Sequence, residues 1–249
     1  MNSPAGRREA APALIPWATG PADGPALVCI PWAGAGAAPF RTWGPLFPPE
    51  VTVYGVRMPG RESRMSEAPL TNVTHIVDEL DREIARLSHR RVAVFGHCSG
   101  ALVGFELARA LGPTTALLLV ASQLPPEEAA RGAEEELGSR ASLAKRYLSS
   151  ELLDDPDIVD MLLPVLEADM HAVSGYNYRS GGLREVPITV FCGVEDPEIR
   201  PCDVNGWRTE TTGPMLVREV EGADHLFAGP AWQRLAACVA DDLRRTLRA

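Results

Sequence analysis

Six short apolar runs recur along the chain, separated by amphipathic or small-residue stretches. Each run is rich in Val, Ile or Leu, and all except residues 116–120 are bounded by Gly, Pro or charged residues, which is typical of a buried β-strand. The predicted strands cover residues 26–30, 51–56, 92–95, 116–120, 186–192 and 215–220.

Amphipathic helices are predicted between strands and after the last of them. Residues 72–87 place apolar side chains on one helical face, and residues 232–247 repeat the pattern near the end of the chain. A third helix follows residue 100 and ends at Gly112-Pro113. Strands that alternate with helices predict one α/β domain over residues 1–249, with a mostly parallel, doubly wound sheet. In such a sheet, functional residues belong at the carboxyl ends of the strands.

The segment from about residue 123 to about residue 182 has no strand signal. Its acidic and helical stretches cover residues 127–137, 142–153 and 157–176. In a sheet protein such a block is an insertion, and we expect a helical lid over the functional end of the sheet. Its apolar side chains would face the core or a substrate channel, and core packing is the simpler interpretation for most of them. These side chains are Leu162, Leu163, Val165, Leu166, Met170 and Val173.

The composition limits the function classes without selecting one. Of the 249 residues, 45% are hydrophobic and 23% are charged, which is an ordinary globular mixture. The formal net charge of −9 and the lack of a long basic run argue against a nucleic-acid partner. The apolar runs are too short to span a membrane.

The N-terminal residues and the cysteines fit a reducing, cytoplasmic compartment. Residues 1–17 are rich in Pro and Ala and lack the apolar core of a signal peptide, so we expect a loose tail. Five cysteines, an odd number without Cys-x-x-Cys spacing, predict neither a disulfide framework nor a zinc site. A free thiol at Cys98 fits a reducing, cytoplasmic compartment. We expect a monomer.

One strand, turn and helix carry the strongest chemical signal. The strand at residues 92–95 runs into Gly96-His97-Cys98-Ser99-Gly100, and helical spacing begins directly afterwards. A Gly-x-nucleophile-x-Gly turn in this context is the nucleophile elbow of α/β-hydrolases, which predicts that fold. Both glycines are needed because a strained turn packs them against strand and helix with no room for a Cβ. The alternative is a small buried cysteine without chemistry.

Two further candidates, Asp196 and His225, each follow a predicted strand. The order nucleophile, acid, histidine is that of the α/β-hydrolases, and all three side chains would lie on one rim of the sheet. His225 would take the proton of Cys98 or hold the sulfur as a thiolate, and Asp196 would orient the imidazole. Glu195 and Asp224 are the nearest alternatives to Asp196, which the Gly-x-x-Asp-Pro sequence turns outward.

Backbone amides would complete the site. The small-residue loop after the first strand supplies half of the oxyanion hole in this fold, and we assign the hole to the N–H groups of Ala33 and Ser99. Ser99 is a weaker candidate for the nucleophile because it lies one position past the apex. His97 is expected to hydrogen-bond to nearby backbone. Gly34-x-Gly36 lacks the third glycine and the lysine of a phosphate loop, and we expect no metal and no cofactor.

With these residues in place, the chain resembles the type II thioesterases of polyketide and non-ribosomal peptide assembly lines over nearly its whole length. The resemblance is carried by residues 31–36, 58–62, 96–100, 162–169, 176–178, 193–197 and 222–225. It implies a stand-alone α/β-hydrolase that cleaves acyl groups from phosphopantetheine thioesters on acyl or peptidyl carrier proteins. It also implies a triad of Cys98, Asp196 and His225. The carrier would bring the phosphopantetheine arm.

The chain departs from this family at two places. Trp32 stands where the family usually has His, and Cys98-Ser99 stand where it has Ser-Met. A thiolate, favoured by the helix N-terminus and by His225, would exchange one thioester for another and keep the acyl group activated. The protein would then transfer the acyl group to an amine, thiol or hydroxyl acceptor, or cyclise it, as well as hydrolyse it. A non-catalytic carrier-binding protein is the second alternative, against which the intact Asp196 and His225 argue.

An acidic carrier protein would need a local basic surface in spite of the negative net charge. Arg57, Arg61 and Arg64 are close in sequence and are the candidates. For Arg61, an ion pair with its neighbour Glu62 is the simpler expectation.

Overall fold

The computed structural model describes residues 11–132, 140–147 and 153–248. Within these residues, seven strands form one sheet in the order β1-β3-β2-β4-β5-β6-β7, in which only β1 runs antiparallel to its neighbour. The strands are β1 (Leu14–Ala18), β2 (Ala26–Ile30), β3 (Thr52–Val56), β4 (Val92–His97), β5 (Thr115–Ala121), β6 (Ile188–Gly193) and β7 (Met215–Val220). The expected α/β fold with a mostly parallel sheet is confirmed.

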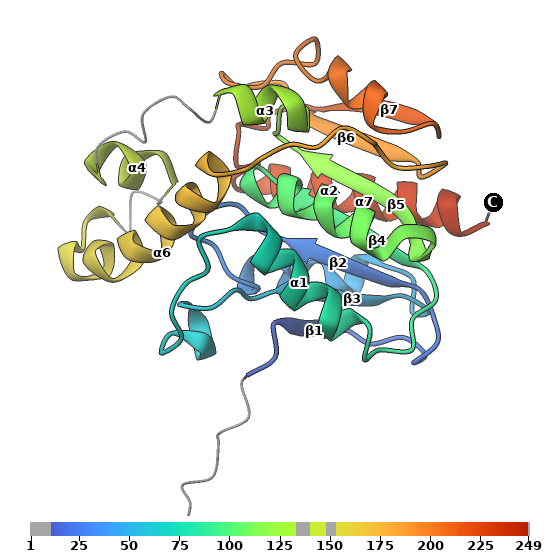
Figure 1. The fold of residues 1–249 in the computed structure, drawn as a ribbon, viewed down its shortest axis with the longest axis horizontal. Helices are drawn as coiled ribbons and strands as arrows, with labels where there is room; N and C mark the ends of the chain where they lie inside the picture. Colours follow the sequence, from blue (N-terminus) through green and yellow to red (C-terminus); the bar gives the residue numbers. More distant parts are fainter. Residues whose placement is uncertain (1–10, 133–139, 148–152, 249) are drawn as a thin grey trace, which may run out of the picture.

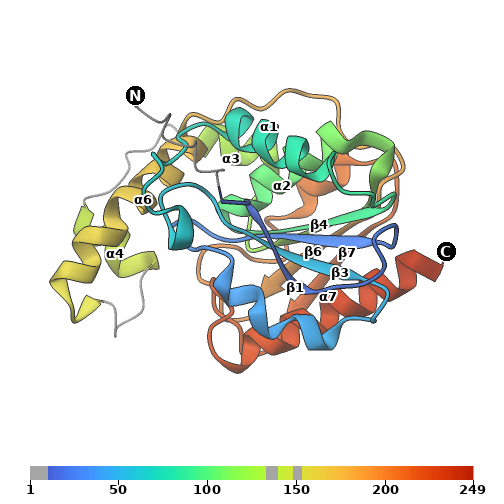
Figure 2. The same ribbon diagram turned by 90° about the horizontal axis from the view of Figure 1, so that it is seen from below.

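Helices cover both faces of the sheet (Figures 1 and 2). Helices α1 (Val73–Ile84) and α2 (Ser99–Leu111) pack on one face, and α7 (Pro230–Arg248) packs on the other. Short 3-10 helices connect the elements: η1 (Ala38–Thr42), η2 (Gly44–Leu46), η3 (Glu62–Arg64), η4 (Gly112–Thr114) and η5 (Asn205–Glu210). Each face has its own apolar core. Because β4 lies near the middle of the sheet and is buried along its whole length, the turn after it has a rigid base.

The expected loose tail over residues 1–17 is wrong for its described part. Strand β1 pairs with β3, and the backbone N–H groups of Ala13 and Leu14 donate to the Glu83 carboxylate at 2.8 and 2.9 Å. An edge strand tolerates Pro16 because one side of its backbone needs no partner, and the register shifts directly after this proline. So short a strand, interrupted by proline, has too little alternation to be recognised in the sequence. Residues 1–10 lie outside the described part of the chain.

Between β5 and β6, where the sequence predicts an insertion, the described chain leaves the sheet and forms helices. These are α3 (Pro126–Gly132), α4 (Arg140–Tyr147) and α6 (Pro156–Ser174), and α4 and α6 lie beyond the carboxyl ends of the strands (Figure 1). Parts of the predicted helices at 127–137 and 142–153 fall outside the described residues. Leu163 and Leu166 of α6 are buried in one cluster with Cys98, so these helices cover the predicted nucleophile.

Membrane insertion through a long apolar helix finds no support in the described ranges, since none of their helices is both long and apolar enough to cross a bilayer.

Candidate active site

Cys98 lies at the apex between β4 and α2, in a backbone conformation that few residues adopt. Its φ of 51° and ψ of −124° lie outside the regions that L-residues occupy without strain. Two backbone hydrogen bonds of 2.8 Å hold the turn, from Cys98 N–H to Ala121 O and from Ala101 N–H to Cys98 O. The thiol is thereby turned out of the sheet and toward the helices of the insertion.

The glycines on either side of the apex are required by close contacts. A Cβ on Gly96 would overlap the Gly100 carbonyl and Ala101 Cα, and a Cβ on Gly100 would overlap the Pro31 carbonyl. Only residues without a Cβ allow strand, turn and helix to approach this closely. The steric reason given for these glycines from the sequence is therefore confirmed.

The structure brings Cys98, His225 and Asp196 together at the carboxyl ends of β4, β6 and β7. His225 Nε2 lies 3.3 Å from Cys98 Sγ, and His225 Nδ1 lies 3.0 Å from Asp196 Oδ2. The other Asp196 oxygen accepts the backbone N–H groups of Glu198 and Ile199 at 2.9 and 3.2 Å. This turn fixes the carboxylate, which in turn fixes the imidazole against the thiol.

Neither alternative acid replaces Asp196. Glu195 is exposed, and Asp224 accepts a backbone N–H of its own loop at 3.0 Å. A residue that the sequence analysis missed, Glu198, has its Oε2 at 3.8 Å from His225 Nδ1. Its place two residues after Asp196, in Asp-Pro-Glu, was the only available signal. His225 therefore faces two carboxylates.

The charges of this site follow from these contacts. Burial lowers the pKa of His225, but hydrogen bonds with Asp196 and Cys98 outweigh it and raise the pKa to about 10. Burial raises the pKa of Asp196, but hydrogen bonds from His225 and the Glu198 backbone outweigh it, so that this pKa is below its ordinary value. At neutral pH, Asp196 is therefore ionised and His225 carries a proton on each ring nitrogen.

His97, the residue before Cys98, contacts the backbone of His225 and not its ring nitrogens. Its Nε2 donates to the His225 carbonyl at 2.8 Å, which confirms the expected hydrogen bond to nearby backbone. The ring packs against Trp32, Phe227 and Trp232 at centroid distances of 5.1, 5.6 and 5.9 Å. Burial lowers the pKa of His97 to about 4, and the hydrogen bond to the His225 backbone offsets only part of this effect. His97 is therefore neutral at physiological pH.

The two N–H groups predicted for the oxyanion hole belong to Ala33, which follows β2 and shares an apolar cluster with Cys98, and to Ser99, which directly follows Cys98. Ser99 is the first residue of α2, so its N–H has no acceptor within the helix. Neither the Ser99 N–H nor the Ala33 N–H is hydrogen-bonded within the ranges that the structure describes. Ala33 and Gly34 are the central residues of a turn closed by Ala35 N–H to Trp32 O at 3.1 Å. The φ of 81° at Gly34 is that of a type II turn.

The expected ion pair between Arg61 and Glu62 is wrong. Arg61 has an extended backbone, which turns neighbouring side chains to opposite sides, and its guanidinium binds Asp169 of α6 at 2.7 and 2.8 Å. The two side chains are only 5% and 11% exposed. Arg61 also donates to Ala35 O at 2.9 Å, and Asp169 accepts the Gly34 N–H at 2.7 Å.

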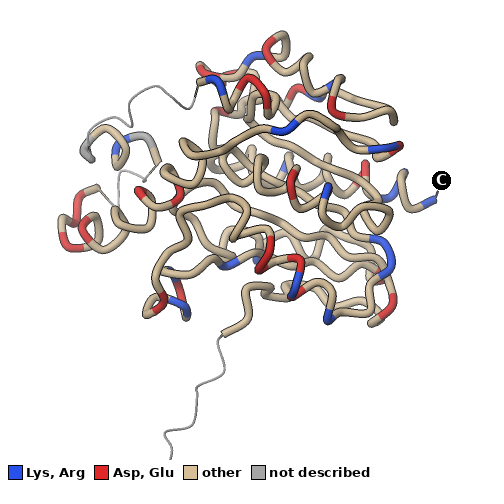
Figure 3. The backbone as a smooth tube through the Cα atoms, in the orientation of Figure 1, with Lys and Arg blue, Asp and Glu red and all other residues tan. Residues whose placement is uncertain are grey.

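The other two candidate arginines are also engaged. Arg64 is buried against Glu67 and Glu79, and Arg57 donates to the Pro12 carbonyl at 2.9 Å. In Figure 3 the outer end of α6 is acidic, with Asp residues in the sequence there, and Lys and Arg are scattered over this view. The three arginines therefore do not form the basic surface that their spacing suggested.

A small cavity of about 20 Å³ lies next to the turn. Ser99 lines it together with Val103 of α2 and Ala172 of α6. His225 Nε2 contacts the sulfur of Cys98 and not the hydroxyl of Ser99, so the structure does not favour Ser99 as the nucleophile.

Comparison with known proteins agrees with the geometry. A family model described as "Thioesterase domain" matches residues 25–243. The chain is 33% identical to the gramicidin S biosynthesis protein GrsT of Aneurinibacillus migulanus, over 81% of this chain and 82% of that protein. It is 30% identical to thioesterase PikA5 of Streptomyces venezuelae, over 87% and 80% of the two chains.

A solved structure extends the likeness to three dimensions. The type II thioesterase BorB from the borrelidin biosynthetic cluster superposes with a TM-score of 0.79 at 26% identity, over 97% of this chain and 100% of that one. The chain therefore belongs to the thioesterase family, among the type II thioesterases of polyketide and non-ribosomal peptide biosynthesis.

Proposed function

We propose that this thioesterase cleaves acyl groups held as phosphopantetheine thioesters on acyl or peptidyl carrier proteins, through an acyl-enzyme on Cys98. The observation that carries the proposal is the 3.3 Å contact of Cys98 Sγ with His225 Nε2, together with Asp196 on the far side of the ring. Similarity to proteins named for gramicidin S and borrelidin biosynthesis supports the substrate class.

In the first half-reaction, the Cys98 sulfur attacks the thioester carbonyl. The carbonyl oxygen becomes an oxyanion, and the N–H groups of Ala33 and Ser99 stabilise it because they have no competing partner. When the intermediate collapses, the bond to the phosphopantetheine sulfur breaks, and His225 Nε2 gives that sulfur its proton. The products are acyl-Cys98 and the free thiol of the carrier.

In the second half-reaction, His225 takes a proton from water, and the resulting hydroxide attacks acyl-Cys98. The same two N–H groups stabilise the second oxyanion, and its collapse releases the carboxylic acid and restores the Cys98 sulfur. Asp196 keeps the imidazole in place throughout both steps and stabilises it whenever it is protonated, since its carboxylate is fixed by the two backbone N–H groups of its own turn.

Transfer of the acyl group is the second candidate function, and cysteine at the apex is the observation that favours it. Acyl-Cys98 is itself a thioester, so it keeps the activation that an ester on serine would lose. An amine, thiol or hydroxyl acceptor in place of water would give an amide, a new thioester or an ester, including cyclic products.

Intact-protein mass spectrometry after incubation with an acyl-phosphopantetheine thioester tests both functions. Hydrolysis predicts an acyl adduct on the wild type that disappears as free acid accumulates, and no adduct on Cys98→Ala. Transfer predicts an adduct that persists in water and is discharged by added amine. Hydrolysis at the wild-type rate by Cys98→Ser, with the same product, would remove the reason for proposing transfer. Turnover by Cys98→Ala, or no adduct and no turnover by the wild type over a range of acyl lengths, would contradict the proposed role of Cys98.

A further inference from the structure

The ion pair of Arg61 and Asp169 joins three segments that are distant in sequence. Arg61 lies in the loop after β3, Asp169 lies on α6, and both bind the turn at residues 32–36, which we call the oxyanion loop. Asp169 accepts a hydrogen bond from the Gly34 N–H, and Arg61 donates one to Ala35 O. The ion pair therefore holds two consecutive residues of this loop, one through its N–H and the other through its carbonyl.

The hydrogen bond to Gly34 selects one conformation of the turn. In the type II turn seen here, the N–H of the central peptide, between Ala33 and Gly34, points at the Asp169 carboxylate. If this peptide flipped to the type I orientation, the Ala33 carbonyl would turn toward a carboxylate and the bond would be lost. The charge of Asp169 therefore favours the one peptide orientation that is present beside the thiol.

Helix α6 contacts the same turn through a second side chain. Leu166 lies one helical turn before Asp169 on the same face, and its Cδ1 is 3.5 Å from the position that a Cβ of Gly34 would occupy. Leu166 also belongs to the apolar cluster that contains Cys98 and Ala33. If α6 moved away from the sheet, the oxyanion loop would lose its apolar cover and its carboxylate acceptor together, and Arg61 would be left buried without its partner.

We propose that Arg61 and Asp169 are positioning residues, which hold the oxyanion loop, and with it the Ala33 N–H, in place beside the thiol and make the oxyanion hole depend on a docked α6. The inference rests on the proposed function, because it concerns the oxyanion of that reaction. Neither residue touches the reacting atoms. A purely structural ion pair would stabilise the fold without affecting the loop.

Two reactions of Cys98 separate these roles. Acyl transfer forms an oxyanion, whereas alkylation by iodoacetamide displaces iodide and forms none, so only the first needs the loop in place. We expect Asp169→Asn to lower kcat for an acyl-phosphopantetheine thioester by about 10- to 100-fold, as for other small misplacements at active sites. The same variant should alkylate at Cys98 within about twofold of the wild-type rate, with KM changed less than kcat.

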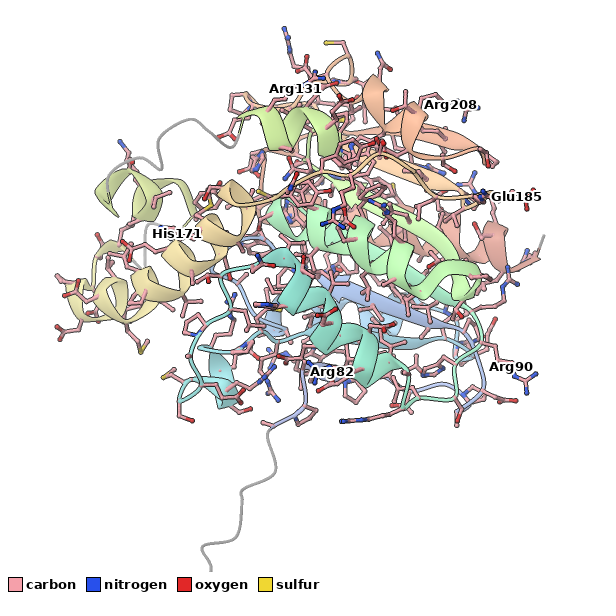
Figure 4. All side chains as sticks on the ribbon, viewed as in Figure 1. Arg82, Arg90, Arg131, His171, Glu185 and Arg208 are labelled. Carbon is pink, nitrogen blue, oxygen red and sulfur yellow. The ribbon has the colours of Figure 1, made fainter. Side chains whose placement is uncertain are left out.

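Two variants serve as matched controls. Glu79→Gln removes one acidic partner of Arg64, another buried arginine whose ion pairs do not touch the oxyanion loop. His171→Gln changes a residue of α6 only two positions after Asp169, and His171 is exposed (Figure 4). Both should keep the wild-type kcat. Because Asp169→Asn leaves Arg61 buried without a charged partner, the double variant Arg61→Met/Asp169→Leu provides an apolar replacement that also lacks the acceptor for Gly34.

The inference is overturned if a folded Asp169→Asn or the double variant keeps the wild-type kcat, or if alkylation falls in parallel with kcat. Failure of the proposed function would look different, because the wild type itself would then turn over no thioester.

Discussion

Two histidines, His97 fully buried and His225 partly buried, lie side by side at this site, with 6.4 Å between their ring centroids, in surroundings of opposite character. His225 lies between a thiol and a carboxylate, whereas His97 is enclosed by the rings of Trp32, Phe227 and Trp232. Burial lowers the pKa of both imidazoles, yet one pKa is raised to about 10 and the other is lowered to about 4. A partner that accepts a hydrogen bond with a full negative charge therefore decides the outcome, and burial alone does not.

The two rings are also linked through one carbonyl. His97 Nε2 donates a hydrogen bond to the His225 carbonyl, so the uncharged ring helps to fix the backbone that carries the charged one. His97 Nδ1 has no hydrogen-bond partner within the described ranges. A proton on that nitrogen would be buried beside the charge of His225, and the aromatic enclosure prevents it. The surroundings of His225 therefore favour a protonated ring, and the surroundings of His97 favour a neutral one.

The largest effect should come from removing the charged ring. We expect His225→Gln to lower kcat/KM by about 10⁴-fold or more, in line with the loss of one member of a catalytic triad. His97→Gln keeps a side-chain N–H donor for the His225 carbonyl and should cost only about 10-fold. Steady-state kinetics of the two variants, with circular dichroism to verify folding, measures the difference. Equal losses would mean that the division of roles between the two histidines is wrong.

The next largest effect should come from removing the charge that distinguishes the two rings. Asp196→Asn deletes the anionic acceptor of His225, so the pKa of His225 should fall from about 10 toward its ordinary value. We expect a loss of about 10³-fold in kcat, since neutral asparagine neither stabilises the imidazolium nor enforces its tautomer. Nitrogen-15 NMR of the imidazole rings as a function of pH measures the shift directly, with His97 as an internal reference. An unchanged titration of His225 would assign its high pKa to Cys98 instead.

The meeting of Cys98, Asp196 and His225 was predictable from the sequence, whereas the contacts that hold their surroundings in place were not. Gly96 and Gly100 flank the apex at fixed spacing, and Asp196 and His225 follow strands whose apolar pattern is strong, so topology alone places them together. Arg61 and Asp169 are separated by 108 residues, and no local pattern connects them. Glu198 was hidden for the same reason, because its contact with His225 depends on how two loops meet.

The fold shows the same limit. Continuous apolar runs predict the inner strands well, because burial on both faces leaves few polar positions. Strand β1 was missed because an edge strand needs only part of its backbone paired and one face covered, and Pro16 interrupts its pattern. Contacts between residues that are distant in sequence decide the pairing of an edge strand and the partners of a side chain, and local sequence patterns do not reveal such contacts.

A smaller effect should appear in stability as a function of pH. The unfolded chain protonates His97 near its ordinary pKa of 6.5, whereas the folded protein does so only near 4, so between these values the unfolded state binds more protons. The contribution of His97 is therefore fully present above pH 6.5 and is lost as the pH falls toward 4. When the pH falls from 7.5 to 5.0, we expect the protonation of His97 in the unfolded state to lower the free energy of unfolding of the wild type by about 2 kcal/mol.

Urea denaturation of the wild type and His97→Gln at both pH values measures this loss. Carboxylates titrate in both proteins, so the difference between the two isolates His97. The variant should be less stable at pH 7.5 and should lose about 2 kcal/mol less than the wild type on acidification to pH 5.0. Parallel losses would show that the aromatic enclosure does not keep His97 neutral.

The smallest expected effect tests the aromatic enclosure of His97 itself, at Trp32. Trp32→His would place a polar ring where an indole now packs edge-on against His97, 5.1 Å away between centroids. A polar neighbour, or water admitted beside the smaller ring, would give His97 Nδ1 a partner and so raise the pKa of His97 toward its ordinary value. The acid-linked loss of stability should then shrink to about 1 kcal/mol between pH 7.5 and 5.0. Trp32→Phe, which keeps an apolar ring, is the matched control and should retain most of the wild-type loss. If Trp32→His also retains it, Phe227 and Trp232 keep His97 neutral without help from the oxyanion loop.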